Sequence, residues 1–136
     1  MKMPVLLLIA SVVLVSGCTQ YGQQAQQPTP VPKGTGGGDK FIIEITGSGF
    51  SPSTMAVDAG NTVTFINKDS KPHWPASAFH PSHTVYPESG GCIGSKFDAC
   101  KGLSQGEEWA FTFNQRGTWK YHDHLNPGLA GTVVVK

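Results

Sequence analysis

The apolar residues of positions 40–136 occur in short alternating runs, and this periodicity constrains the fold more than any other feature of the chain. In a strand, side chains at every second position share one face. A helix needs apolar positions three and four apart, and no such stretch here is long enough for one. The runs, each bounded by turn residues, are 41–45 (FIIEI), 55–57 (MAV), 62–67, 109–113, 119–121 and 132–135. The pattern predicts an all-β sandwich or barrel.

Residues 68–105 interrupt the alternating pattern and contain Pro72, Pro75, Pro81 and Pro87. Irregular stretches of this length inside a compact domain are usually functional loops. Three of the five histidines and two of the three cysteines lie in this segment. We therefore expect a long irregular loop insertion that carries part of a functional site.

The N-terminus has the features of an export signal. Lys2 precedes an apolar run at 5–15 (VLLLIASVVLV), which is shorter than the roughly 20 residues that span a membrane and fits a signal peptide. Ser16-Gly17-Cys18 follows and resembles a lipobox, so that 1–17 is predicted as a lipoprotein signal peptide and Cys18 as the lipidated residue. An ordinary signal peptide, or a short membrane anchor with an incidental Cys, is the alternative.

The next segment is predicted to be a flexible tether. Residues 18–39 begin with the lipidated Cys and are rich in Gln, Pro and Gly, a composition that buries too little apolar surface to order the chain. The sequence thus predicts one domain at 40–136, held to a membrane by its lipid anchor. We expect an extracytoplasmic location, at the cell surface or in the periplasm.

Export also determines how the remaining cysteines are interpreted. Disulfides persist in oxidising compartments, and Cys92 and Cys100 are the pair left once Cys18 is assigned. We expect a disulfide between them, with a pair of thiolate metal ligands as the alternative. The net charge of +1, with 14% charged residues and no basic stripe, argues against nucleic acid as a partner.

Four stretches of the chain resemble the cupredoxin family, the plastocyanin- and azurin-like proteins. They are 50–57, 60–73 (GNTVTFINKDSKPH), 117–121 (GTWKY) and 128–136 (GLAGTVVVK). The resemblance implies a Greek-key β-sandwich, one copper ion as cofactor, and His73 as the first copper ligand. It also implies electron transfer or copper trafficking with a protein partner.

The second ligand loop departs from the family pattern, in which a Cys, a His and a Met follow the Tyr strand. Counting from Gly117 places Asp123 at the Cys position and Leu129 at the Met position. Counting back from Leu129 keeps His124 as the His but places Tyr121 at the Cys. A blue-copper site needs a thiolate, so this chain is predicted not to form one.

Histidines replace the missing sulfur ligands. His122 and His124 lie two apart, so on an extended segment they point the same way. His80 and His83 form a second pair across a proline. We expect His73, His122 and His124 to share one copper ion in an all-histidine, type-2-like site, with His80 or His83 completing it. The intervening Asp could ligate the ion or orient a ring.

These features predict a copper-binding lipoprotein that holds or transfers copper or electrons. A mononuclear copper oxidoreductase with an open coordination position is one alternative, and a metal-free binding module is another. No residue marks a substrate, so the sequence does not assign an enzymatic activity.

Overall fold

The computed structural model describes residues 40–136; the predicted signal peptide, Cys18 and the rest of the tether lie outside the described residues. The described residues form eight strands and no helix. In chain order the strands are β1 (Phe41–Thr46), β2 (Gly49–Ser51), β3 (Thr54–Val57), β4 (Asn61–Asn67), β5 (Pro75–Ser77), β6 (Glu108–Phe113), β7 (Gly117–Asp123) and β8 (Asn126–Val135). The predicted all-β fold is confirmed.

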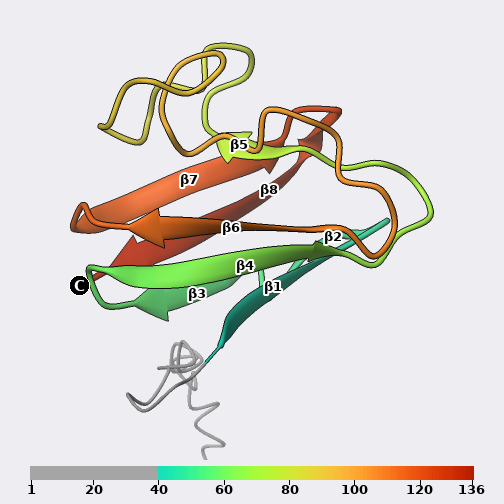
Figure 1. The fold of residues 1–136 in the computed structure, drawn as a ribbon, viewed down its shortest axis with the longest axis horizontal. Helices are drawn as coiled ribbons and strands as arrows, with labels where there is room; N and C mark the ends of the chain where they lie inside the picture. Colours follow the sequence, from blue (N-terminus) through green and yellow to red (C-terminus); the bar gives the residue numbers. More distant parts are fainter. Residues whose placement is uncertain (1–39) are drawn as a thin grey trace, which may run out of the picture.

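The strands form two four-stranded sheets (Figure 1). One sheet has the order β2-β1-β4-β6 and the other the order β3-β8-β7-β5. The β1–β4 and β3–β8 pairs are parallel and the other pairs antiparallel. From β2 to β7 consecutive strands alternate between the two sheets, and the two parallel pairs join segments that lie apart in the sequence. The fold is the predicted sandwich.

The alternation in the sequence corresponds to burial in the structure. On β4, Val63 and Phe65 point into the core, and on β1 so do Ile43 and Ile45. Such positions line the inner faces of both sheets and form one continuous core. The buried apolar side chains that the strands contribute include Ile43, Ile45, Phe50, Met55, Val57, Val63, Phe65, Phe113, Tyr121, Val133 and Val135.

The long irregular segment after β5 is part of the core, because three of its side chains are almost completely buried: Tyr86, Phe97 and Leu103. The ring of Phe97 lies 5.0 Å from that of Phe111 and 4.9 Å from that of Phe113, measured between centroids. The segment therefore has no regular secondary structure but a fixed position along the edge of the sandwich that β5 forms (Figure 1).

The predicted disulfide is confirmed. Cys92 and Cys100 are bonded, with their Cα atoms 5.7 Å apart, and close a small loop that contains Phe97. In the described part of the chain no helix is long and apolar enough to cross a membrane.

Phe97→Ala is expected to lower the free energy of unfolding by about 3–5 kcal/mol, because it leaves a cavity in the core. Phe79→Ala, in the same segment, is the matched control: its ring is 67% exposed, and we expect a change within about 0.5 kcal/mol. Urea denaturation of the metal-free protein measures both. Equally small losses would contradict the conclusion that the segment is anchored in the core.

Candidate metal centre

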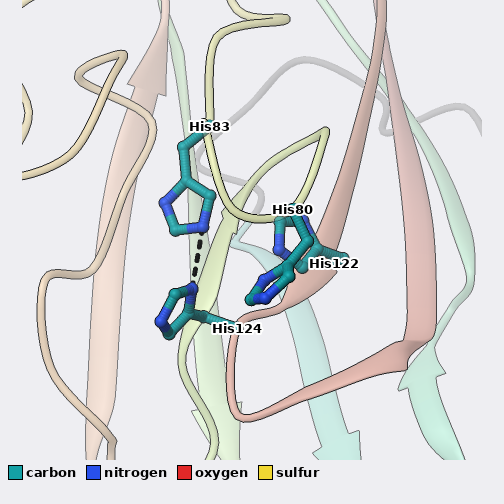
Figure 2. A group of neighbouring side chains, drawn as sticks. All are labelled: His80, His83, His122 and His124. Carbon is teal, nitrogen blue, oxygen red and sulfur yellow. Dashed lines mark hydrogen bonds between the residues drawn. The ribbon is translucent and has the colours of Figure 1, made fainter.

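Four of the five histidines lie together at one end of the sandwich. Each of His80, His83, His122 and His124 offers a ring nitrogen, and these four atoms lie within 4.8 Å of one another. Figure 2 shows the four rings turned toward a common centre. The structure thus brings together both predicted pairs.

The pairing of β5 with β7 explains this convergence. Ala76 lies opposite His122 and Ser77 opposite Tyr121, so the loop that leaves β5 begins beside β7, next to His122. The backbone N–H of His124 donates to the carbonyl of Trp74 at 2.7 Å, which continues the contact beyond the strand end. His122 and His124 therefore face the loop that carries His80 and His83.

The distances within the group suit a shared ion. Nε2 of His83 and Nδ1 of His124 are 2.9 Å apart. Ring centroids are 5.4 Å apart for His80 and His122, and 5.0 Å apart for His83 and His122. Two metal–imidazole bonds of about 2 Å each allow nitrogens up to about 4 Å apart. Small side-chain adjustments therefore bring all four nitrogens onto one centre.

His122 gives the strongest indication that a ligand is bound here. Its side chain is 4% exposed, yet neither ring nitrogen has a hydrogen-bond partner among the described residues. Buried polar atoms normally have partners, since an unpaired one is costly. A metal ion at the centre of the group would supply a partner for one of these two nitrogens.

The electrostatics of the group favour the neutral forms of His122 and His124. Burial, and next the nearby His83, lower the pKa of His122 to about 4. The same two causes, in the same order, lower the pKa of His124. Metal ions bind neutral imidazole, so protons compete less for these rings than for an exposed histidine.

His83 is fixed from outside the group. It is fully buried, and its Nδ1 lies 2.6 Å from Oδ2 of Asp98, which leaves Nε2 facing the other histidines. Its backbone adopts a φ of 52°, in the left-handed region that non-glycine residues rarely occupy. Such conformations persist only where surrounding contacts enforce them.

The structure differs from the sequence-based expectation at His73, which does not lie in the four-histidine group. Its Nδ1 is 2.7 Å from Oδ2 of Asp123, and its Nε2 is 3.0 Å from Oδ2 of Asp69. Hydrogen bonding from His73 is the main cause of a lowered pKa for Asp69. Because both nitrogens face carboxylate oxygens, neither is available to a metal ion. The sequence could not exclude this use of the ring.

Asp123 orients the segment that carries His122 and His124, and its side chain bonds groups outside the four histidines. Its Oδ1 accepts from the backbone N–H groups of Trp74 (2.8 Å) and Leu125 (3.1 Å), and its Oδ2 bonds His73. The carboxylate is fully buried. Of the two roles left open for this Asp, these contacts match an orienting role and not that of a metal ligand.

Sequence reasoning missed two carboxylates, Asp69 and Asp98, which bond histidines in the structure. Asp98 lies fifteen residues from its partner, and carboxylates are too common for this spacing to stand out. The other possible metal group, Cys92, Asp98 and Cys100, has its two sulfurs joined in the disulfide. The alternative of a thiolate pair is therefore not realised.

The fold and this group of imidazoles define a metal-binding β-sandwich, and comparison with known proteins gives its family. Residues 40–136 match the model of the copper-binding proteins of the plastocyanin/azurin family. The chain belongs to that family, and the predicted resemblance is confirmed. Copper is accordingly the cofactor of this domain.

Individual relatives agree with this assignment. Amicyanin of Paracoccus denitrificans is 31% identical over 98 residues, a match that covers 71% of this chain and 65% of amicyanin. A purple cupredoxin of Nitrosopumilus maritimus superposes with a TM-score of 0.58 at 24% identity, over 71% of this chain and all of that chain. An oxidised amicyanin mutant superposes with a TM-score of 0.56 at 25% identity, over 71% of this chain and 81% of the other.

His73→Ala is expected to lower the free energy of unfolding of the metal-free protein by about 3 kcal/mol or more, because it leaves the buried Asp123 without its partner. Lys71→Ala, an exposed neighbour, is the control and should stay within about 0.5 kcal/mol. Denaturant titration in the presence of a chelator measures both. If His73 were only a ligand, its removal would leave the stability of the metal-free protein unchanged.

Proposed function

We propose that this protein is an exported copper carrier, which holds one copper ion with His80, His83, His122 and His124 and passes it to a protein partner. The observation that carries the proposal is the convergence of four imidazoles around His122, whose buried ring nitrogens have no other partner among residues 40–136. Membership of a copper-binding family supports copper as the ion.

The composition of the ligand set favours copper holding over fast electron exchange. Imidazole suits Cu(II), which binds nitrogen ligands more tightly than the other common divalent ions. Blue-copper electron-transfer sites have a Cys thiolate, and the sulfurs of Cys92 and Cys100 form a disulfide. When bound, copper would supply a one-electron centre at this end of the domain, with weak visible absorption.

One ligand is positioned for exchange with a partner. His80 is exposed, whereas His83 and His122 are buried and His124 is partly buried. A ligand group of a partner protein can replace the exposed imidazole first while the buried ones keep the ion. The gradient in exposure thus supports stepwise transfer of copper. The signal peptide, Cys18 and the tether would place the domain outside the cytoplasm, on a membrane.

A groove beside the group favours a second candidate function, a mononuclear copper oxidoreductase. The groove has a volume of about 480 Å³, and its lining includes Phe79, His80 and His122. A small substrate could approach an open copper position through it. Turnover of superoxide or phenols by the copper-loaded protein would favour the enzyme, and its absence would favour the carrier.

Replacing His83, His122 or His124 singly by Ala is expected to weaken copper binding at least about tenfold, because each change removes a ligand. His80→Ala should weaken copper binding less, since His80 is exposed. Competition with a copper chelator measures the affinity of the full-length protein in detergent.

The electron spin resonance spectrum should be of the type-2 kind, and His73→Ala should leave it unchanged. Unaltered affinity in all four variants would move the site elsewhere, and intense thiolate absorption would refute the ligand set.

Cys18→Ala is expected to prevent lipidation, because the acylated thiol is lost. The variant should appear in the soluble fraction or accumulate as an uncleaved precursor, whereas the unchanged protein fractionates with membranes. Mass spectrometry and detergent partition measure this, with Cys18→Ser as a second variant of similar size. Identical mass and partition in variant and parent would remove the anchor from the proposal.

A further inference from the structure

Asp98 is the buried carboxylate on which the hydrogen bonds around the four histidines converge. It is 5% exposed, and both of its oxygens face donors. Oδ1 accepts from the indole Nε1–H of Trp74 at 2.6 Å and from the backbone N–H of Cys100 at 2.9 Å. Oδ2 lies 2.6 Å from Nδ1 of His83. None of the four histidines is adjacent to it in sequence.

The contact with His83 determines which ring nitrogen carries the proton. An ionised carboxylate only accepts hydrogen bonds, so Nδ1 of His83 must be the N–H donor. In the neutral ring, Nε2 then has a free lone pair, and this atom faces Nδ1 of His124 at 2.9 Å. The carboxylate therefore selects the tautomer of His83 that can bind a metal through Nε2.

The same carboxylate also positions a second aromatic side chain. Through Nε1–H, Asp98 holds the indole of Trp74, whose ring lies 4.4 Å from that of His124 between centroids. Trp74 thus packs against one member of the group while Asp98 bonds another. One buried charge orders both the His83 and the His124 sides of the centre.

The loop closed by the disulfide holds Asp98 against His83. The backbone N–H of Ser95 donates to the carbonyl of His83 at 2.8 Å. A Cβ atom at Gly94 would overlap the carbonyls of Ser82 and His83, so only glycine permits this close approach of the two backbones. Because the two backbones pack directly against each other, the carboxylate of Asp98 has little freedom to move.

We propose that Asp98 is the positioning residue of the copper centre, which fixes His83 as its Nδ1–H tautomer and thereby presents Nε2 to the metal. The inference rests on the proposed copper ligation by the four histidines. It assigns a role to a residue outside that set, one that acts through His83 and does not itself touch the ion.

Asp98→Asn provides the sharpest test because it keeps the shape of the side chain and replaces one carboxylate oxygen with an N–H₂ donor. Asn offers one acceptor oxygen where Asp98 offers two. If that oxygen faces Trp74 and Cys100, the amide N–H₂ faces His83 and favours the wrong tautomer. If the oxygen faces His83, the N–H₂ meets the donors of Trp74 and Cys100. We expect copper affinity to fall about 10–100-fold, with Glu88→Gln, the same kind of exchange in the irregular segment after β5, as the unchanged control.

A double-mutant cycle separates positioning from a general loss of structure. His83→Ala should weaken copper binding, and Asp98→Asn should weaken binding less in that variant than in the parent protein, because most of its effect passes through the ring of His83. Additive losses would overturn the inference. If His83→Ala alone has no effect, the proposed ligand set fails; if it weakens binding but Asp98→Asn does not, only the role of Asp98 fails.

A measurement on the unmodified protein covers the case in which the Asn variant does not fold. Nitrogen-15 NMR of the histidine rings in the full-length, metal-free protein in detergent reports which nitrogen of His83 is protonated. We expect the neutral ring to carry its proton on Nδ1 and not on Nε2. The opposite tautomer would overturn the proposal without any substitution.

Discussion

The metal centre depends on the burial of aromatic side chains from a segment without regular secondary structure. Phe97 and Tyr86 insert into the sandwich core, and the ring of Phe97 packs against rings of both sheets. This burial offsets the loss of conformational entropy in the segment. His80, His83 and Asp98 all belong to it, so the hydrophobic core determines where the polar centre forms.

Much of the fold could be predicted from the sequence because it depends on a local pattern. Alternating residues such as Val63 and Phe65 mark a strand with one buried face, and β1, β4, β6 and β7 are found where the alternation lies. The strands β2 and β5 have three residues each, too few to show a period. The start of β8 was missed because Pro127 and Gly128 resemble a turn.

The centre was less predictable than the fold because its members are set by long-range geometry. The spacing of His122 and His124 identified one pair correctly as neighbours in space. His73 has the same side chain, yet two carboxylates occupy its nitrogens. An imidazole can bind a metal or bond to acids, and sequence spacing does not distinguish these uses. Asp69 and Asp98 become visible only once the chain is folded.

The four histidines are divided equally between two parts of the chain, with consequences for how the protein moves. His122 belongs to β7 and His124 directly follows that strand, whereas His80 and His83 belong to the loop after β5. A bound ion would cross-link these parts and lower the population of states in which the loop detaches locally. Loss of the ion would raise amide hydrogen exchange and protease cleavage in this loop first. The protection of this loop against exchange and cleavage would therefore distinguish the copper-bound protein from the copper-free protein.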